Sequence, residues 1–321
     1  MPWIVGIDEA GYGPNLGPLV MTSVACRIPA ELEGGDLWRV LRSAVRRHPS
    51  ADDGRLLVED SKLIYSTTRG LHALEKGVLA ALCSWAVAEE VCLAHYIDRV
   101  CPAAHPELRG EPWYAGTSRL PARAEPGVCQ KAGRRFQRAC ARKGVIWGLV
   151  RSVVVCPRRF NELLDQWGSK AAALGQGLAD LLRCNRRPDD EAEPMTFFVD
   201  KHGGRNYYAA LLQHALPDGL VVAHAESLDR SEYSVLGLER PMRLVFQPRA
   251  DAEHFCVALA SMVSKYLREL LMLEFNQFWQ AQVPGLKPTA GYPGDSARFL
   301  AEIRDAIERL AIPEAALWRR K

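Results

Sequence analysis

The sequence predicts an α/β fold in which helices flank a mixed β-sheet. Short runs of β-branched residues alternate along the chain with longer segments whose apolar residues recur at helical spacing. The first two runs, at 3–8 and 18–27, are joined by a glycine-rich bend, which predicts an early hairpin. Strands that alternate with helices typically form one sheet covered by those helices. We therefore expect a layered α/β architecture.

The individual elements follow from the spacing of apolar residues. Strands are expected at 3–8, 18–27, 146–156, 196–200, 220–225 and 243–246. Helices are expected at 36–48, 71–91, 160–182, 207–215, 251–278 and 296–310. In the second of these helices, Leu71, Leu74 and Val78 repeat at the spacing of one helical face. In the third helix, Gly175 and Gly177 predict a weak point.

The composition is that of an ordinary globular protein. The chain has 321 residues and a net charge of only +3, so a nucleic-acid-binding surface would have to be local. Its nine cysteines include no Cys-x-x-Cys pair, which favours free thiols in a reducing compartment. No uncharged apolar run is long enough to cross a membrane. We expect a cytoplasmic protein that makes no membrane contact and is a monomer.

The chain is expected to form one domain over residues 1–321. Residues 94–144 are rich in Pro, Gly and Arg and are interpreted as an inserted basic segment. Residues 251–321 are expected to form a helical C-terminal part. The charged stretch 185–194 is predicted to be a solvated loop.

The segment from Ile4 to Val20 is the most informative part of the sequence. A β-branched run there delivers two adjacent carboxylates, Asp8 and Glu9, and glycines follow at once. Because successive strand side chains point to opposite faces, both acids can serve one ion only if the strand ends there; the glycines supply that break. Carboxylates beside exposed backbone N–H groups suit a hard divalent cation together with a phosphate. A β-turn with solvated acids is the alternative.

This segment resembles the opening strand of type 2 ribonucleases H (ribonuclease HII), where Asp-Glu precedes a small residue, Gly-Arg-Gly, Gly-Pro and an apolar strand. Further blocks follow in the family's order: Asp60-Ser61-Lys62-Leu63, Phe197-Phe198-Val199-Asp200, Asp251 ten residues before Ser261 in the stretch Leu259–Glu269, and Gly291-Tyr292-Pro293. The resemblance implies a ribonuclease H-like fold, a mixed five-stranded sheet flanked by helices, with inserted segments.

The resemblance also implies an activity. The residues that match the family's catalytic acids are Asp8, Glu9, Asp200 and Asp251. They would hold two Mg²⁺ or Mn²⁺ ions, which activate water and stabilise the leaving oxygen in phosphodiester hydrolysis. The implied enzyme is an endonuclease that cuts the RNA strand of RNA–DNA hybrids, or DNA at single ribonucleotides, leaving 5′-phosphate and 3′-hydroxyl ends. As alternatives, Asp251 is an ordinary helix N-cap, or Glu226 or Asp229 is the fourth ligand.

Other residues are expected to contact the nucleic acid: Gly11, Tyr12, Gly13, Lys62, Arg205, Lys265, Arg268 and Tyr292. Lys265 and Arg268 share a helical face from which they could reach a phosphate; surface salt bridges are the alternative. Arg205 follows Asp200 in a glycine-containing loop. Tyr292 resembles the family's tyrosine that packs on the sugar at the RNA–DNA junction, and a turn that plugs the core is the alternative.

A cationic stripe is predicted within the inserted segment. Residues 126–161 contain no acid. The basic residues that repeat there at helical spacing are Lys131, Arg134, Arg135, Arg138 and Arg142. Phosphates attract such a stripe without regard to sequence, whereas a solvated helix face is the ordinary alternative. We expect this stripe to contact nucleic acid.

The glycine motif departs from the family's pattern. Tyr12 stands where the family has Arg, while Gly11 and Gly13 keep the backbone with which the family senses the ribonucleotide 2′-hydroxyl. Because this cation is absent, a nuclease of the same fold that acts on another structured nucleic acid is a second hypothesis. A catalytically silent nucleic-acid-binding protein is the third.

Overall fold

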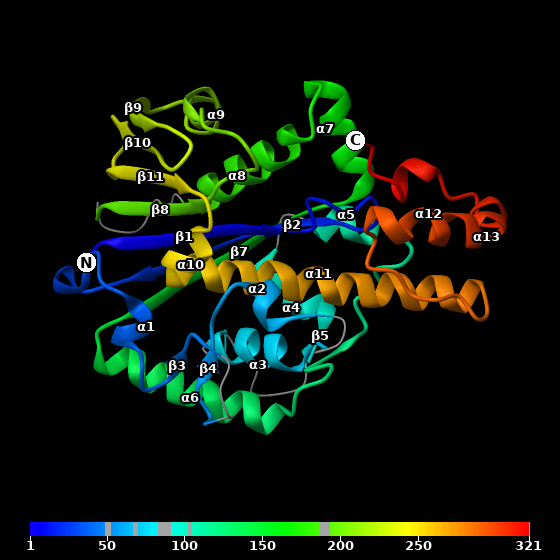
Figure 1. Ribbon diagram of the computed structural model, residues 1–321, viewed down its shortest axis with the longest axis horizontal. Helices are drawn as coiled ribbons and strands as arrows, with labels where there is room; N and C mark the ends of the chain where they lie inside the picture. The colour runs from blue at the N-terminus through cyan, green and yellow to red at the C-terminus, as the bar shows by residue number, and fades with distance from the viewer. Residues whose placement is uncertain (49–52, 67–69, 83–90, 102–104, 186–192, 321) are drawn as a thin grey trace.

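The computed structural model describes residues 1–48, 53–66, 70–82, 91–101, 105–185 and 193–320. At its centre lies a seven-stranded mixed sheet in the order β7-β2-β1-β8-β11-β10-β9 (Figure 1). The strands are β1 (Trp3–Ala10), β2 (Leu19–Arg27), β7 (Ile146–Val155), β8 (Met195–Asp200), β9 (Leu220–Glu226), β10 (Ser231–Leu236) and β11 (Met242–Gln247). The predicted α/β class is confirmed, but the sheet has seven strands and not five.

The strand that the sequence did not reveal is β10. Its buried side chains, Ser231, Tyr233 and Val235, alternate with partly exposed or exposed ones, as in other strands of the sheet. Ser231 is polar, however, and its hydroxyl donates a hydrogen bond of 2.6 Å to the carbonyl of Asn206. A polar residue on the inward face left the run too weakly apolar to be predicted as a strand.

The pairing of the central strands sets the position of two acids. β1 and β8 are parallel, and Ile7 pairs with Val199, so the next residues, Asp8 and Asp200, emerge beside each other. β11 is parallel to β8 on its other side, whereas β2 is antiparallel to β1. Parallel strands end at the same edge of a sheet, which is where α/β proteins usually bind ligands.

Helices cover both faces of the sheet. α11 packs against β1 and β2 on one face, and α8 packs against β7 and β2 on the other (Figure 1). The helices are α1 (Leu37–Val40), α2 (Ser61–Ile64), α3 (His72–Ala81), α4 (Leu93–Val100), α5 (His105–Arg109), α6 (Pro126–Arg142), α7 (Pro157–Trp167), α8 (Ala171–Asn185), α9 (Ala209–Ala215), α10 (Ala250–Glu253), α11 (Phe255–Gln282), α12 (Pro293–Glu302) and α13 (Arg304–Arg309). Two short ladders pair β3 (Val45–Arg46) with β4 (Leu56–Leu57), and β5 (Val91–Cys92) with β6 (Arg119–Leu120).

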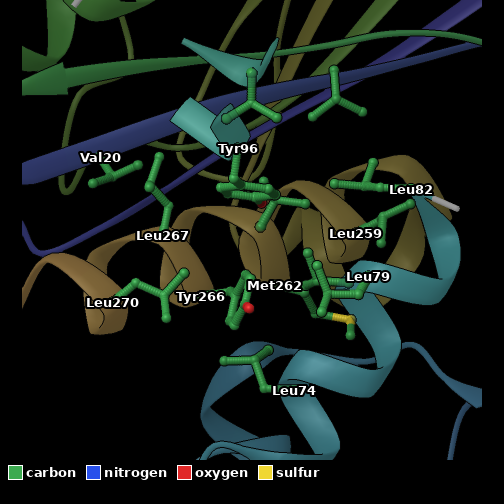
Figure 2. Packing of buried hydrophobic residues seen from close by; sticks show 14 of the residues in the cluster. Val20, Leu74, Leu79, Leu82, Tyr96, Leu259, Met262, Tyr266, Leu267 and Leu270 are labelled. Atoms are coloured by element: carbon green, nitrogen blue, oxygen red, sulfur yellow. The ribbon is translucent and has the colours of Figure 1, made fainter. Parts of the chain in front are cut away.

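The long helix α11 is buried on nearly all sides because it lies between the sheet and a second helical layer. Its Met262 meets Leu79 of α3, while Leu267 points toward Val20 of β2 (Figure 2). Burying each such side chain contributes about 1.5–3 kcal/mol. α11 is therefore a firmly packed base for the polar residues that it presents at the sheet edge.

Two predicted helices are shorter than expected. At 36–48 only α1 is helical: Asp36 caps it by accepting from the N–H of Trp38 at 2.8 Å, and the chain then enters β3. The pairing of β3 with β4 is a long-range contact that overrides the local helical pattern. At 71–91, α3 ends at Ala81, and residues 83–90 lie outside the described part of the chain.

Other predicted helices are divided. The segment 160–182 forms α7 and α8, and the break lies at Gly168 (φ 71°), where a left-handed residue ends α7, and not at Gly175 or Gly177. Gly177 lies within α8, where a β-carbon would be in contact with Met21. The segment 251–278 is divided at His254 into α10 and α11, and the C-terminal helix is divided into α12 and α13.

The segment 94–144 is tied to the rest of the fold by two buried carboxylates. Glu75 of α3 accepts hydrogen bonds of 2.7 Å from three successive N–H groups, those of residues 122–124. Glu274 of α11 accepts from the N–H groups of Gly116 and Ser118 at 2.9 and 3.1 Å. These bonds fix two turns of the segment against α3 and α11.

Three expectations from composition can be compared with the structure. The eight cysteines that it describes are free thiols, as expected. Among the described helices, none combines the length and apolar character that a membrane span requires. Most of the predicted charged loop, residues 186–192, lies outside the described residues.

Candidate active site

A pocket of about 660 Å³ opens at the edge of the sheet where β1 and β8 end. Residues of the glycine-rich bend, α2, α10, α11 and the turn before α12 complete it. Its lining residues are Asp8, Glu9, Ala10, Gly11, Tyr12, Gly13, Arg47, His48, Glu59, Asp60, Ser61, Lys62, Leu63, Asp200, Arg249, Asp251, Ala252, Ser261, Lys265 and Tyr292. All four acids predicted to be catalytic thus line one pocket.

Asp8 and Glu9 lie within β1 itself. The expectation that the strand ends at these acids is wrong, because β1 continues to Ala10 and both acids pair with β2. They nevertheless line the same pocket, since the ladder between β1 and β8 stops at Ile7 and leaves the following stretch of β1 open on that side. Asp8 is fixed by the hydroxyl of Ser261 and by the N–H of Glu9, which donates to its Oδ1 at 2.7 Å.

Asp200 and Asp251 reach the pocket from the next elements of the fold. Asp200 is the last residue of β8, and its Oδ1 accepts a hydrogen bond of 2.9 Å from the N–H of Ala250 at the start of α10. Asp251 follows in the first turn of α10. The alternative that Asp251 is an N-cap does not hold, because Arg249 and His254 occupy the N-cap positions of α10 and α11.

The two rival acids for the fourth position lie elsewhere. Glu226 ends β9 and accepts a hydrogen bond of 2.5 Å from the hydroxyl of Tyr233. Asp229 is exposed in the turn that follows. Neither lines the pocket, whereas Asp251 does.

Burial and, to a smaller extent, the crowding of carboxylates raise the pKa values of the four acids. Burial, together with the charges of Glu9 and Asp200, raises the pKa of Asp8 well above its usual range. Burial and the charge of Asp200 raise the pKa of Glu9 to about 7. Burial, with Asp60 and Asp200 nearby, raises the pKa of Asp251 to about 6, and burial raises that of Asp200. The pocket therefore concentrates negative charge that lacks full compensation.

The donor chemistry of the pocket fits a hard divalent cation. Its acids offer only oxygen ligands, and Oε2 of Glu9 is buried without a hydrogen-bond partner. Within the described residues, no group of three or more His, Cys, Asp or Glu side chains is already arranged closely enough to hold an ion. The acids thus share a pocket but do not form a closed coordination shell.

The predicted contact residue Lys62 has neighbours in the pocket that were not predicted as site residues. Burial lowers the pKa of Lys62, but the carboxylates of Asp60 and Asp8 outweigh this effect and raise it overall. Asp60 also caps α2 by accepting from the N–H of Lys62 at 2.9 Å. Arg47 donates to Glu59 at 3.1 Å. The Asp-Ser-Lys block could have indicated Asp60, whereas nothing local in the sequence marks Arg47 or Glu59.

The glycine-rich bend is held from several distant segments. Gly11 (φ 90°) adopts a conformation that favours glycine, and Gly11, Tyr12 and Gly13 all line the pocket. The N–H of Asn15 donates to the carbonyl of Gly291 at 2.8 Å, and the N–H of Arg319 donates to the carbonyl of Asn15 at 2.8 Å. The bend is therefore braced by the turn before α12 and by the C-terminal residues.

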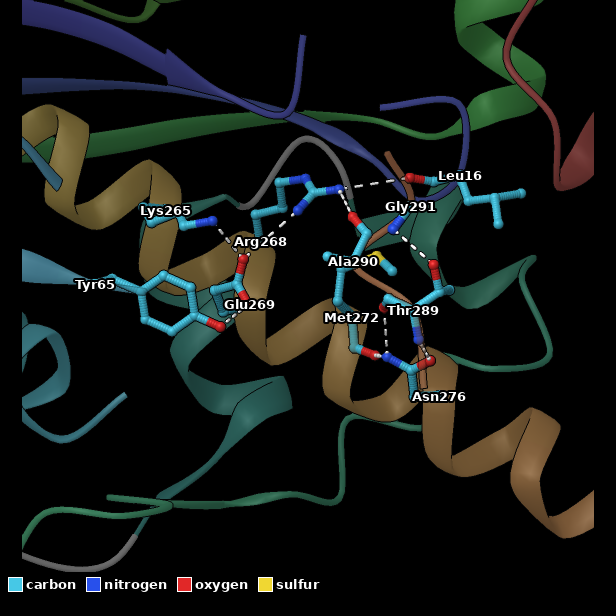
Figure 3. Close-up of polar contacts among 10 residues, drawn as sticks. All are labelled: Leu16, Tyr65, Lys265, Arg268, Glu269, Met272, Asn276, Thr289, Ala290 and Gly291. Atoms are coloured by element: carbon cyan, nitrogen blue, oxygen red, sulfur yellow. Dashed lines mark hydrogen bonds and ion pairs between the residues drawn. The ribbon is translucent and has the colours of Figure 1, made fainter. Parts of the chain in front are cut away.

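Lys265 and Arg268 have different environments although they share a helical face. Lys265 lines the pocket and donates to Glu269 at 2.6 Å; the same carboxylate accepts from the hydroxyl of Tyr65 at 2.6 Å (Figure 3). Arg268 is only 1% exposed, and its guanidinium donates to the carbonyl of Ala290 at 3.0 Å. The predicted phosphate contact does not fit Arg268, whose role is to hold the loops around the pocket.

Tyr12 has two cations nearby. The ammonium of Lys170, from the turn between α7 and α8, lies 5.8 Å from the centre of the Tyr12 ring. Arg205 also acts on Tyr12 electrostatically, but its guanidinium lies 5.8 Å from the ring centre of Tyr208, and Arg205 does not line the pocket. No local pattern in the sequence indicated Lys170.

Tyr292 lies at the rim of the pocket. Its side chain is 48% exposed, so the alternative of a turn that plugs the core does not hold. Its ring faces the glycine-rich bend: a β-carbon at Gly13 would lie 3.9 Å from Cε1 of Tyr292. The predicted cationic stripe of α6 is exposed but lines a separate groove; its residues are Lys131, Arg134, Arg135, Arg138 and Arg142.

The fold and the pocket define an α/β protein with an acidic site at the ends of its central parallel strands. No protein-family model matches the chain, and no curated protein does either. The chain is similar in structure to the ribonuclease H2 of Pyrococcus horikoshii OT3, with 16% identity, coverage of 98% of this chain and 92% of that one, and a TM-score of 0.48.

It is also similar to the RNase HII of Archaeoglobus fulgidus, solved in complex with PCNA, with 16% identity, coverage of 99% and 94%, and a TM-score of 0.45. A third similar structure is Bst-RNase HIII in complex with Mn²⁺, with 13% identity, coverage of 99% of this chain and 65% of that one, and a TM-score of 0.40. These likenesses concern the backbone, whereas the function of this chain has to be inferred from its own pocket.

Proposed function

We propose that this protein is a metal-dependent endonuclease that hydrolyses the RNA strand of RNA–DNA hybrids, and DNA at single embedded ribonucleotides. The observation that carries this proposal is that four carboxylates, from β1, β8 and α10, line one pocket. Carboxylate oxygens are the ligands that Mg²⁺ and Mn²⁺ prefer. The raised pKa of Glu9 and its unpartnered Oε2 support a need for a cation at this place.

The residues that would hold two Mg²⁺ or Mn²⁺ ions are Asp8, Glu9, Asp200 and Asp251. When bound, such a pair of ions lowers the pKa of a water and stabilises the leaving oxygen of a phosphodiester. The protein orients its ligands beforehand: the hydroxyl of Ser261 fixes Asp8, and the N–H of Ala250 fixes Asp200. Lys62 and Lys265 line the same pocket and would attract the phosphate.

Recognition of a ribonucleotide is assigned to the glycine-rich bend and Tyr292. The 2′-hydroxyl is both donor and acceptor, and it distinguishes RNA from DNA. Gly13 carries no side chain that would block its approach, and the exposed ring of Tyr292 faces this bend. A side chain at Gly11 would point toward Arg268, so Gly11 presents only its backbone to the pocket. An aromatic ring at that position can pack against a sugar or base.

Tyr12 favours a second candidate function. The ring of Tyr12 lies near the ammonium of Lys170, which comes from another segment of the chain. With an arginine in the bend, the positive charge would come from the bend itself, so the contacts at this wall of the pocket differ. The second candidate is a nuclease of the same chemistry that acts on another structured nucleic acid. A catalytically silent nucleic-acid-binding protein is the third candidate, and it requires that the acids can be replaced without loss of function.

The test is cleavage of three labelled duplexes with Mg²⁺ or Mn²⁺: an RNA–DNA hybrid, DNA with one ribonucleotide, and DNA alone. Asp8→Asn is the inactive variant, and Asp229→Asn, an exposed acid outside the pocket, is the matched control. The proposal expects cleavage of both ribonucleotide-containing duplexes by the wild type and by Asp229→Asn, and none by Asp8→Asn.

Each other result selects one of the alternatives. Cleavage of the hybrid alone would indicate that the wall containing Tyr12 does not recognise junctions. Cleavage of a branched or flapped duplex in preference to all three would support the second candidate. Binding without any cleavage, unchanged in Asp8→Asn, would leave the silent nucleic-acid-binding protein.

A further inference from the structure

A second concave surface, which we call the cationic groove, lies between α6 and the residues around β3 and β4. Its volume is about 870 Å³. Six of its lining side chains are cationic: Lys76, Lys131, Arg134, Arg135, Arg138 and Arg142. Its acidic lining residue is Asp53, which pairs with Arg55 at 2.6 Å. The groove therefore carries an excess of positive charge.

The folding of α6 accounts for this concentration of charge. Phe136, Ala139 and Cys140 face inward and are buried, so helical geometry places the basic residues together on the outer face. Within the described part of the chain, Lys131, Arg134 and Arg138 have no carboxylate at ion-pair distance. Their charges are consequently available to an anion from outside.

One arginine fixes the two walls of the groove relative to each other. Arg135 donates through Nε to the carbonyl of Ser43 at 2.7 Å and through Nη1 to the carbonyl of Asp53 at 2.9 Å. Arg142 also lies within 3.4 Å of the hydroxyl of Ser43. These bonds join α6 to the residues that precede β3 and β4, so the spacing of the cations is set before any ligand binds.

The cationic groove lies close to the candidate active site along the chain. Ser43 lines the groove, and Arg47 lines the acidic pocket. Four residues of fully extended chain span at most ~14 Å. One strand of a duplex carries a phosphate every ~3.4 Å along the helix axis, so this distance corresponds to about four base-pair steps. A single duplex is long enough to occupy both surfaces.

We propose that the cationic groove binds the phosphate backbone of the same duplex whose scissile bond lies in the acidic pocket, several base pairs from the cut. This inference rests on the proposed function and adds a requirement to it: affinity depends on how far the duplex extends beyond the pocket. Arg134 and Arg138 are the contacting residues, and Arg135 is a positioning residue. Because phosphates are the ligands, the contact is independent of base sequence.

The test compares the double variant Arg134→Gln/Arg138→Gln with the control Arg304→Gln/Arg309→Gln, which removes two exposed charges from α13. Binding of a hybrid of about 8 base pairs and one of about 24 is measured by fluorescence anisotropy over a range of salt concentrations. In the groove variant, the affinity for the long hybrid should fall about 5- to 20-fold and its logarithmic salt slope by about 2. The loss for the short hybrid should be smaller, because fewer of its positions on the protein reach both surfaces. The control should match the wild type.

Cleavage provides the second readout. The groove variant should raise KM for the long hybrid and leave kcat unchanged, because the acidic pocket is intact. Equal losses for short and long hybrids, or a salt slope identical to that of the control, would overturn the inference. The binding comparison is made with proteins that also carry the inactivating Asp8→Asn substitution, so it is independent of cleavage. Length-dependent binding that vanishes in the groove variant thus supports the groove even if no duplex is cut, and only the proposed function then fails.

Discussion

The side chain of Arg268 lies directly against the backbone of Gly11. A β-carbon at position 11 would lie 2.4 Å from Nε of Arg268 and 2.6 Å from the carbonyl oxygen of Pro18, so no side chain fits between α11 and the bend. The same guanidinium donates to the carbonyl of Ala290, beside the turn that carries Tyr292 (Figure 3). One buried arginine therefore holds both loops that border the candidate active site.

The first prediction concerns this contact. Gly11→Ala should lower the free energy of unfolding by about 1–3 kcal/mol, because the alanine would be strained at φ 90° and would displace Arg268. It should also reduce kcat/KM on the hybrid. Gly13→Ala is the matched control for stability, since its β-carbon would meet only Tyr292 at 3.9 Å. Urea unfolding measures the stability of both variants, and steady-state cleavage measures kcat/KM of Gly11→Ala. Equal losses of stability at the two glycines would contradict the assigned contact.

The second prediction separates stability from activity at Glu9. Burial and the charge of Asp200 raise the pKa of Glu9 to about 7, so its ionised form destabilises the metal-free protein. Glu9→Gln should therefore raise the free energy of unfolding by about 1–3 kcal/mol in the presence of a chelator at about pH 8, and should abolish cleavage. Saturating Mg²⁺ should stabilise the wild type more than Glu9→Gln. A variant that is less stable than the wild type without metal would contradict this account.

The third prediction is the pH dependence of the difference in the free energy of unfolding between the wild type and Glu9→Gln. An acid whose pKa is raised by folding binds more protons in the folded state, so its contribution to stability is lost as the pH rises between the two values. For Glu9 this window runs from 4.5 to about 7. Burial lowers the pKa values of buried His202 and half-buried His254, to about 3 and about 4, and the effects of these histidines on stability act in the opposite direction. Only the difference in the free energy of unfolding between the wild type and Glu9→Gln isolates the contribution of the Glu9 carboxylate.

That difference should be small below about pH 4.5 and should grow in favour of Glu9→Gln until about pH 7. Unfolding in urea with a chelator, at closely spaced pH values, measures it. A difference that does not change with pH would mean that the pKa of Glu9 is not perturbed in the folded protein.

The parts of the fold that the sequence predicted are those with a strong local signal. β1, β2, β8 and most of α11 follow from apolar runs of the appropriate period, and their bounds differ from the expected ones by a few residues. Asp8 and Asp200 are 192 positions apart, so only the resemblance to a known family could place them in one site; the parallel pairing of β1 with β8 is the physical reason that they meet.

The parts that the sequence did not predict depend on long-range contacts. Residues 41–48 have a helical pattern, but pairing with β4 draws Val45 into a strand. Lys265 and Arg268 are equivalent by spacing, yet only Lys265 reaches the pocket, because the bend and the turn before α12 close over Arg268. The spacing of residues in a single sequence does not indicate which distant segment covers a given face of a helix.

The last prediction concerns the carboxylate that anchors the segment 94–144. Glu75 accepts hydrogen bonds from the three N–H groups of residues 122–124 and one of 2.7 Å from the hydroxyl of Tyr266, and it is fully buried. Glu75→Gln places an amide nitrogen, which cannot accept, against these donors. At least one of the three N–H groups then loses its partner, so the free energy of unfolding should fall by about 2–4 kcal/mol.

Tyr266→Phe is the matched control because it removes a single one of the four bonds to the same carboxylate, and it should cost only about 1 kcal/mol. Urea unfolding of both variants gives the comparison, and hydrogen exchange of residues 122–124 shows whether the loss is local. A Glu75→Gln protein as stable as Tyr266→Phe, with unchanged exchange at these three N–H groups, would mean that the turn is held by packing and not by the carboxylate.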